Sequence, residues 1–274
     1  MSDAAEDWVG RTREATETVT DRQVREFQVT LDGVLAPNAP PVGLQWCLAP
    51  EIYPPADLGR DSHPKLGLFL PDLGLPRRMW AGGKLSYAGT VGAGDTVTRK
   101  TVLRDIKLKD GRSGRLGFVT LHHQYFCGDD LRVSEDHNIV YRDDHTPGAP
   151  APSPPTADPW TPTKRIDILP DPTLLFRYSA MTFNGHRIHY DPGYAVRTEG
   201  YGGLVVHGPL QSTWMQILAT TLLGHPPKDF TYRGLSPLIC NRPAAIEAIE
   251  APGGLSLRVR DIDADVVTMA ADAR

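Results

Sequence analysis

The chain has 274 residues, of which 40% are hydrophobic and 23% charged, a composition that can bury one large core or two ordinary ones and that excludes disorder and collagen. Its 29 basic and 33 acidic residues give a net charge of -4, which excludes the basic field that a nucleic-acid partner requires. With 26 glycines and 25 prolines, we expect a β-rich fold rather than a helical bundle.

Targeting signals and disulfides are not expected. The segment from Met1 to Phe27 lacks the cationic lead and apolar run of a secretory signal, and no stretch reaches the roughly 18 apolar residues of a membrane span. Cys47, Cys127 and Cys240 are odd in number and far apart, which fits reduced thiols better than a disulfide framework or a zinc site. We therefore expect a cytoplasmic protein without a membrane or nucleic-acid partner.

The first half is expected to contain a capped helix and a hairpin. Thr20 and Gln23 form a capping-box pattern in front of an apolar periodic run. Residues 96–109 alternate apolar and polar side chains, and residues 116–126 return after a glycine-rich turn. The glycines of residues 89–95 precede a strand rather than a helix, so they predict a turn and not a dinucleotide-binding loop.

Proline recurs through residues 145–164, so neither a helix nor a central strand can persist there. This segment predicts a stiff, extended linker. It divides the chain into an N-terminal half, residues 1–144, and a C-terminal half, residues 165–274, each an ordinary domain size.

The second half repeats the pattern of the first. Asp171 followed by Pro172 predicts a capped helix, and residues 244–251 and 255–270 are expected to be two strands joined by a turn at residues 252–254. The pairing of a capped helix with later strands in both halves indicates an internal duplication.

The middles of the two halves differ. Residues 209–223 predict a helix that is apolar almost all round and therefore buried. The first half offers only residues 41–49 at the comparable place, which are too short for a full counterpart. We expect an α+β double hotdog, two antiparallel sheets each wrapped around a central helix, with that helix degenerate in the N-terminal half.

Two segments carry a family resemblance: FRYSAMTFNGHRIHYD at Phe176–Asp191 and VVHGPLQSTWM at Val205–Met215. They resemble the MaoC-like dehydratase and hydratase family, and within it most of all the 3-methylfumaryl-CoA (mesaconyl-C4-CoA) hydratases and the related 3-hydroxyacyl-thioester dehydratases. The resemblance implies a coenzyme A thioester as substrate, with its acyl group between the two hotdogs, and no metal ion or redox cofactor. The resemblance also implies that the catalytic residues lie in the second half of the chain.

The family motif reads Asp, any residue, Asn, Pro, an aliphatic residue, His, any residue, Asp. The aliphatic position, His189 and Asp191 match this pattern, whereas Asn184, His186 and Arg187 replace its Asp, Asn and Pro. An amide can orient a water molecule but cannot take a proton from it. A mechanism with two acid-base groups from this motif is therefore in doubt, and His189 has to carry more of the chemistry.

Adding water to an unsaturated thioester requires a base for the water, an acid for the α-carbon and donors for the enolate oxygen. We assign His189 as the general acid-base and Asn184 as the residue that holds the water. The Gly208 N–H, at the start of the buried helix, is the expected oxyanion donor. Asp191 either orients the imidazole or acts as a cap or ion-pair partner, and both alternatives stay open.

The substrate-binding residues follow from the expected acyl group. A 3-methylfumaryl group carries a free carboxylate that needs a cation when buried, and Arg177 and Arg187 are the candidates, unless each pairs with an acidic neighbour. His186 is expected either to contact the substrate or to support the site from behind. His207, in the His-Gly-Pro turn, is expected to contact the substrate.

The predicted reaction is hydration of mesaconyl-C4-CoA to citramalyl-CoA. One alternative is a 3-hydroxyacyl-thioester dehydratase of fatty-acid synthesis, which would accept neutral chains. Another is a thioesterase or a non-catalytic acyl-binding hotdog. Two hotdogs in one chain can pack as a pseudo-dimer, and a homodimer of whole chains is a further open expectation.

Overall fold

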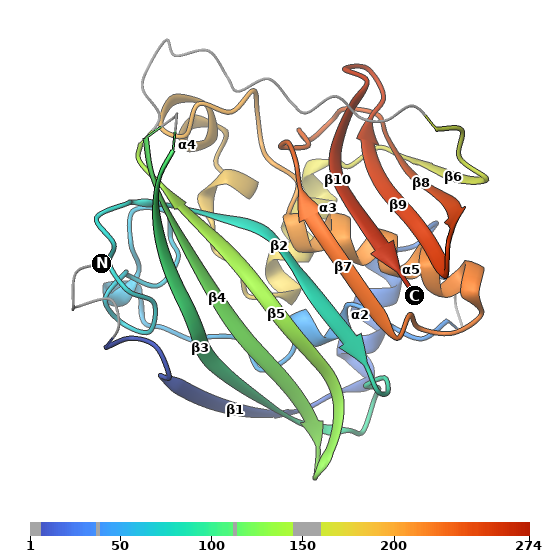
Figure 1. Cartoon of the computed structure of the whole chain (residues 1–274), viewed down its shortest axis with the longest axis horizontal. Coiled ribbons are helices and arrows are strands. Elements are labelled where there is room, and N and C mark those ends of the chain that lie inside the picture. The colour runs from blue at the N-terminus through green and yellow to red at the C-terminus, as the bar shows by residue number, and fades with distance from the viewer. Residues whose placement is uncertain (1–6, 37–38, 112–113, 145–159) are drawn as a thin grey trace.

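The computed structural model describes residues 7–36, 39–111, 114–144 and 160–274. Within these ranges one antiparallel sheet of ten strands runs through the molecule in the order β1-β3-β4-β5-β2-β7-β10-β9-β8-β6 (Figure 1). The strands are β1 (Thr12–Thr18), β2 (Arg77–Tyr87), β3 (Thr96–Gly111), β4 (Gly114–Cys127), β5 (Asp130–Arg142), β6 (Lys164–Ile168), β7 (Asp229–Gly234), β8 (Ala244–Ala251), β9 (Gly254–Asp261) and β10 (Val266–Ala273).

The helices lie mainly in the second half of the chain. The α-helices are α2 (Asp21–Thr30), α3 (Pro172–Met181), α4 (Pro192–Arg197) and α5 (Gly208–Leu223), and the short 3-10 helices are η1 (Leu44–Cys47), η2 (Pro55–Asp57) and η3 (Arg187–His189). Among the described residues, none of these helices has the length and apolar character needed to cross a bilayer.

The two halves share one topology. From its free edge inward, the first half has the order β1-β3-β4-β5-β2, and the second half has the matching order β6-β8-β9-β10-β7. Strands β2 and β7 pair with each other and so join the halves into one sheet. Each half also begins with a strand followed by a capped helix, β1 with α2 and β6 with α3. The expected α+β class is confirmed, and the repeated order agrees with a duplication.

Both predicted helix caps form. The Thr20 hydroxyl accepts from the Gln23 N–H at 3.1 Å, and the Gln23 side chain accepts from the Thr20 N–H at 2.8 Å, which completes the capping box. The Asp171 side chain accepts from the Leu174 N–H at 2.7 Å. These local sequence signals therefore set where α2 and α3 begin.

Helix α5 is the centre of the core. It is buried continuously from Pro209 to Thr220 and lies behind strands β7 to β10 (Figure 1). Gly224 ends it in the left-handed conformation, with φ of 78°. Some of its buried polar side chains are paired: the Thr268 hydroxyl donates to Gln211 at 2.7 Å, and the Gln216 amide donates to the Ser212 hydroxyl at 3.2 Å. The buried helix predicted for residues 209–223 is thus confirmed.

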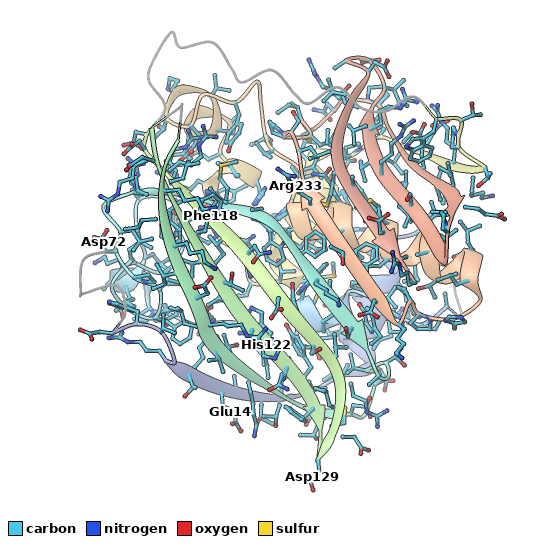
Figure 2. The ribbon with its side chains drawn as sticks, in the orientation of Figure 1. Glu14, Asp72, Phe118, His122, Asp129 and Arg233 are labelled. Carbon is cyan, nitrogen blue, oxygen red and sulfur yellow. The ribbon has the colours of Figure 1, made fainter. Side chains whose placement is uncertain are left out.

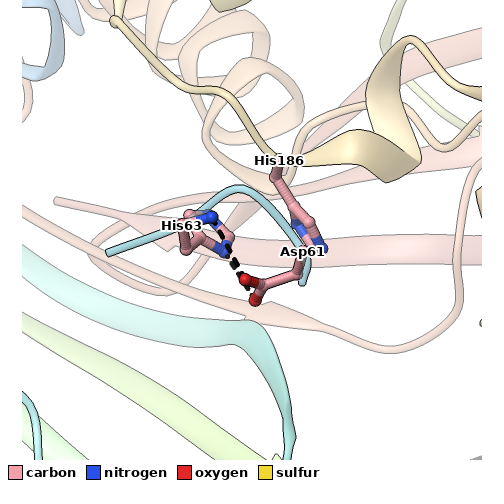
Figure 3. A group of neighbouring side chains, drawn as sticks. All are labelled: Asp61, His63 and His186. Carbon is pink, nitrogen blue, oxygen red and sulfur yellow. Dashed lines mark hydrogen bonds and ion pairs between the residues drawn. The ribbon is translucent and has the colours of Figure 1, made fainter. Parts of the chain in front are cut away.

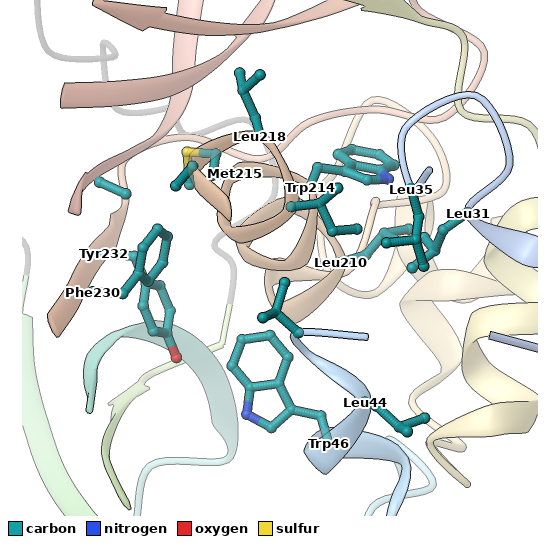
Figure 4. Packing of buried hydrophobic residues seen from close by; sticks show 14 of the residues in the cluster. Leu31, Leu35, Leu44, Trp46, Leu210, Trp214, Met215, Leu218, Phe230 and Tyr232 are labelled. Carbon is teal, nitrogen blue, oxygen red and sulfur yellow. The ribbon is translucent and has the colours of Figure 1, made fainter. Parts of the chain in front are cut away.

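The first half has no such helix among its described residues. The comparable place is taken by the four-residue η1, whose Leu44 and Trp46 pack toward α5 (Figure 4). The expected degenerate helix is therefore confirmed. As a consequence, no long helix fills the inner face of strands β1 to β5.

Two expectations need comment. Residues 255–270 are not one strand, because β9 ends at Asp261, the chain turns, and β10 begins at Val266. The sequence gives no signal for this turn, because the turn contains neither Gly nor Pro. Asp265 takes the left-handed conformation there, with φ of 51°. Most of the expected linker, residues 145–159, lies outside the described residues, so the domain boundaries stay predictions.

The α5 packing predicts a clear difference between two leucines of the same helix. Leu218 is 1% exposed and Leu222 is 41% exposed. Because Leu218→Ala leaves a cavity in the core, we expect it to lower the free energy of unfolding by about 2–5 kcal/mol. Leu222→Ala should change it by less than about 0.5 kcal/mol. Urea denaturation followed by circular dichroism measures both, and equal losses would contradict the central role of α5.

Candidate active site

The segment after α3 forms a tight turn that presents Asn184. Its backbone N–H donates to the Ser179 carbonyl at 2.8 Å, and Phe183 before it is in the left-handed conformation, with φ of 49°. The Asn184 side-chain oxygen accepts from the His186 N–H at 3.0 Å. This bond fixes the amide and leaves its NH2 group as the donor that Asn184 can offer to another molecule.

His189 lies at the end of η3 and is held by Val205. Its Nδ1–H donates to the Val205 carbonyl at 2.7 Å, while the Val205 N–H donates to the Ile188 carbonyl at 3.0 Å. Both backbone groups of Val205 therefore bind the motif segment. Because Nδ1 carries the hydrogen, Nε2 is the nitrogen that can exchange a proton.

The imidazole of His189 is neutral at physiological pH. Burial lowers the pKa of His189 to about 3, although the Val205 carbonyl favours the charged form. His207 stacks on it, with ring centroids 3.6 Å apart and an interplanar angle of 18°. Burial, and then the neighbouring His189, also hold the pKa of His207 well below its ordinary value. His189 is thus held in its neutral form, in which Nε2 has a lone pair and no proton to donate.

Gly208 begins α5 three residues after Val205. The first N–H groups of a helix have no acceptor within the helix, so the Gly208 N–H is free to serve a ligand and the helix adds its positive end. A Cβ atom on Gly208 would lie 3.2 Å from the Trp80 ring of β2. Glycine therefore lets the start of α5 approach the first half closely.

The first half contributes a second group of polar side chains. His63 lies 4.3 Å from His186 between ring centroids, and His186 lies 5.5 Å from His189. Asp61 accepts from His63 Nδ1 at 3.2 Å, as Figure 3 shows, with His186 reaching toward both from η3's side of the site. Three imidazoles and a carboxylate thus follow one another across the junction of the halves.

His63 and Arg78 keep Asp61 charged. The Nη2 of Arg78 donates to both carboxylate oxygens, at 3.2 and 3.0 Å. Burial alone would raise the pKa of Asp61, but the hydrogen bond and charge of His63 and the charge of Arg78 hold it below its ordinary value. The Nε of Arg78 is buried without a hydrogen-bond partner among the described residues.

Asp61, His63 and His186 have donor atoms within 4.8 Å of one another, a spacing that could hold a metal ion. Both oxygens of Asp61 already accept from the Arg78 guanidinium, however. A cation at this place would have to displace Arg78 or repel it. The donor set as arranged fits an ion pair better than a metal site.

A cavity of about 2230 Å³ connects these groups, and its lining comes from both halves. Four of the predicted site residues line it: Asn184, His186, His189 and Gly208. The structure therefore brings together the predicted base, water-holding amide and oxyanion donor. The other four predicted residues lie outside this lining.

Asp191 and Arg187 have structural contacts instead. Asp191 caps α4, accepting from the Tyr194 N–H at 2.9 Å, and pairs with Arg187 Nη2 at 2.7 Å. The idea that Asp191 orients the imidazole is wrong, because Val205 accepts from His189 Nδ1. The idea that Arg187 receives a substrate carboxylate is wrong as well, because its guanidinium serves Asp191 and lies 4.4 Å over the Tyr194 ring.

Arg177 and His207 also lie outside the cavity lining. Arg177 is exposed on α3 and is not part of the cavity lining. His207 is 0% exposed, and its Nε2 forms a hydrogen bond with the Ser179 hydroxyl at 2.8 Å. The expectation of direct substrate contact is therefore wrong for both. His207 instead stacks on the His189 ring.

Sequence reasoning missed the residues of the first half. His63, Arg78 and Trp80 line the cavity, and Asp61 contacts the first two of them; all four are far from the motif in sequence. The one available signal was the segment Asp-Ser-His-Pro at residues 61–64, which sets a carboxylate and an imidazole two residues apart. Nothing in the sequence showed that this segment meets His186.

Comparison with known proteins places this site in a family. Residues 43–240 match the sequence model of hydroxyacyl-thioester dehydratase type 2. The chain belongs to the hydroxyacyl-thioester dehydratase type 2 family. The mesaconyl-C4-CoA hydratase of Chloroflexus aurantiacus is 40% identical to it over 242 residues, which cover 84% of each chain.

Two solved structures resemble this member of the dehydratase family in fold. A MaoC-like dehydratase from Phytophthora capsici has a TM-score of 0.70 at 15% identity and covers 97% of this chain and 95% of its own. A Mycobacterium tuberculosis protein with a double hotdog fold has a TM-score of 0.55 at 16% identity and covers 97% and 96%. The expected MaoC-like resemblance and double hotdog fold are confirmed.

The buried imidazoles of this dehydratase-family site predict an acid-sensitive fold. Burial lowers the pKa of His189 and His137 to about 3, and that of His123, His186 and His207 well below its ordinary value. The unfolded chain takes up these protons near pH 6.5, whereas the folded chain does not. Stability should therefore be constant above about pH 7 and fall between pH 7 and 5.

Urea denaturation at pH 8, 7, 6 and 5 measures this loss. Glu135 has the opposite effect on stability, because burial raises the pKa of its carboxyl group to about 7. One carboxyl group cannot offset the five imidazoles, however. His137→Gln should show a shallower decline than the unaltered protein. A free energy of unfolding that is flat or rises toward pH 5 would show that these imidazoles are not neutral in the folded state.

Proposed function

We propose that this protein hydrates an enoyl-CoA thioester, and that its substrate is mesaconyl-C4-CoA, which it converts to citramalyl-CoA. The observation that carries the proposal is the pairing of a buried, neutral His189 with the free N–H at the start of α5 in one cavity. The identity to the Chloroflexus hydratase supports the choice of acyl group.

His189 is the general base in this proposal. Its Nε2 takes a proton from water held by the Asn184 amide, and the hydroxide forms the new C–O bond at the β-carbon. The electron pair of the double bond moves toward the thioester oxygen, which becomes an enolate. The Gly208 N–H and the positive end of α5 stabilise that oxygen. His63 then gives a proton to the α-carbon, and the proton that His189 took from water returns to His63 through the imidazole cluster, so that one water molecule is added in all.

His63 is the second proton-exchanging group in this proposal. Asn184 cannot carry a proton, whereas His63 lines the same cavity and forms a hydrogen bond with Asp61 at 3.2 Å. The ring contacts from His63 through His186 to His189 keep the two outer imidazoles in one cluster. Asp61 thus replaces, from the first half, the carboxylate that the motif has lost.

Arg78 is the proposed partner of the substrate carboxylate. It lines the cavity beside the imidazole cluster, and its buried Nε has no partner among the described residues. A dicarboxylic acyl group would supply the missing acceptor, whereas a neutral chain would leave Nε unpaired. This observation favours mesaconyl-C4-CoA over the neutral substrates of a fatty-acid dehydratase. Release of free thiol instead would indicate a thioesterase.

Location and assembly are proposals too. A cytoplasmic location is supported by Cys47, Cys127 and Cys240, all free thiols in the structure. A homodimer, expected from the fold class, stays a prediction that sedimentation of the purified protein would decide.

The function is tested by the loss of enoyl-thioester absorbance with purified protein. We expect turnover of mesaconyl-C4-CoA, at least tenfold more efficient in kcat/KM than crotonyl-CoA because only the former has a carboxylate for Arg78. His189→Ala should lower kcat about 100- to 10,000-fold while the protein stays folded.

His225→Ala is the matched control, since His225 is exposed on the turn after α5. It should keep full activity. Normal turnover by His189→Ala would refute its role as the base. Equal efficiency on crotonyl-CoA and mesaconyl-C4-CoA would refute the carboxylate partner.

The role of His63 predicts a kcat effect. His63→Gln should lower kcat about 100-fold, with KM changed less than threefold, because proton transfer and not binding is impaired. Asp61→Asn should lower kcat as well and should also raise KM, because it weakens the pair that holds Arg78. A chelator such as EDTA should leave the activity of the unaltered protein unchanged. Loss of activity with EDTA, restored by Zn²⁺, would instead make Asp61, His63 and His186 metal ligands and contradict this role.

A further inference from the structure

The inner face of the first-half sheet carries charged side chains where a hotdog core would be apolar. Strand β1 places Arg13 opposite Thr101 of β3, Thr101 lies opposite His123 of β4, and His123 lies opposite Glu135 of β5. Side chains alternate along strands, so the outward neighbours Glu14 and His122, labelled in Figure 2, belong to the other face. One polar row thus crosses four strands.

This polar row is buried but reached by the cavity. Thr101 is 1%, His123 6% and Glu135 1% exposed. Arg13, His123 and Glu135 line the same cavity as His189, and so does Arg99 of the next row. The face is open because η1 stands in place of a central helix.

Arg13 is held in place, but some of its hydrogen-bond donors have no partner among the described residues. It pairs with Glu51 through Nη2, and its guanidinium lies 4.1 Å over the Phe69 ring. Its Nε and Nη1 are buried and have no hydrogen-bond partner among the described residues. Buried donors without partners are uncommon and costly, so a missing acceptor is the simplest reason for them.

Arg99 adds a second positive charge at this place. It lies opposite Tyr125 in the register and interacts with the Tyr125 hydroxyl. Burial, and then the charge of Arg99, lower the pKa of Arg13 to about 10. Glu51 balances one of these charges. Because burial raises the pKa of Glu135 to about 7, Glu135 balances the other only in part.

A line of rings connects this place to the start of α5. The centroid of the Trp80 ring, next to Gly208, lies 3.7 Å from that of His137, with the rings tilted by 30°, and His137 lies 5.8 Å from His123. Three strand spacings, about 14 Å, separate β2, which carries Trp80, from β3, which carries Arg99. A four-carbon acyl group, with C–C bonds of about 1.5 Å, is shorter than one spacing. Its carboxylate cannot reach Arg99 while the thioester lies at Gly208.

We propose that Arg13 and Arg99 form a second anion-binding subsite, which receives a carboxylate or phosphate group carried farther from the thioester than a four-carbon acyl group extends. This subsite rests on the proposed function, because it assumes a thioester at Gly208. Two parts of a ligand have that chemistry: the phosphates of coenzyme A, and the terminal carboxylate of a longer dicarboxylic acyl chain.

Steady-state kinetics of Arg13→Gln and Arg99→Gln test the subsite. The substrates are mesaconyl-C4-CoA, its pantetheine thioester without phosphates, decenoyl-CoA, and decenoyl-CoA with a terminal carboxylate. We expect KM to rise about tenfold or more with kcat nearly unchanged, the loss typical of one charge-assisted hydrogen bond. Lys100→Gln, the exposed neighbour on β3 that faces outward, should leave KM unchanged.

The pattern of the KM changes identifies the anion. A rise for every CoA thioester that disappears with the pantetheine thioester assigns the subsite to the phosphates. A rise confined to the long dicarboxylic substrate assigns it to the acyl carboxylate. KM values within twofold of the unaltered protein on all four substrates would overturn the subsite, as would an equal effect of Lys100→Gln.

Two controls separate this inference from the proposed function. If the unaltered protein hydrates none of the thioesters, the proposed function fails. Calorimetric binding of free coenzyme A and of decanedioic acid to the unaltered protein and to Arg99→Gln then decides the subsite alone, and equal affinities overturn it. If Arg99→Gln does not fold, Arg99→Lys is the second variant. It keeps the positive charge but lacks the planar guanidinium that binds an anion with two hydrogen bonds, so KM should still rise.

Discussion

The hydrogen bond from His189 Nδ1 to the Val205 carbonyl is the constraint on which the site depends. Val205 also donates its N–H to Ile188 and forms an antiparallel bridge with Ile239. One residue therefore holds the imidazole, joins η3 to the core and lies three positions before Gly208. The hydrogen bond to the Val205 carbonyl limits rotation of the His189 side chain and so holds Nε2 in place relative to the start of α5.

Loss of one central helix defines the rest of the binding space. In the second half, α5 fills the inner face of β7 to β10 with a continuous core. In the first half, η1 covers only part of the corresponding face, and the cavity occupies the space that is left. Charged and imidazole side chains can lie on that face because a ligand or water, rather than a helix, is adjacent to them.

In the proposed mechanism the two halves share the chemistry of the site. The motif residues His189 and Asn184 come from the second half, and Asp61, His63 and Arg78 come from a loop and strand of the first. Pairing of β2 with β7 fixes the halves relative to each other, so these groups meet in a defined arrangement. We propose that Asp61 of the first half takes the place of the acidic residue that the motif of the second half lacks.

The sequence by itself determined the local elements and the family. Caps at Thr20 and Asp171 and the apolar run of α5 depend on near neighbours, and motif residues match by position, so all could be predicted without coordinates. Only the tertiary structure decided which side chains meet. Asp61 meets His186 across more than a hundred residues, whereas Arg187 and Asp191 pair locally, four residues apart. The contact of Asp61 with His186 depends on the sheet register that joins the halves, and no short-range pattern encodes that register.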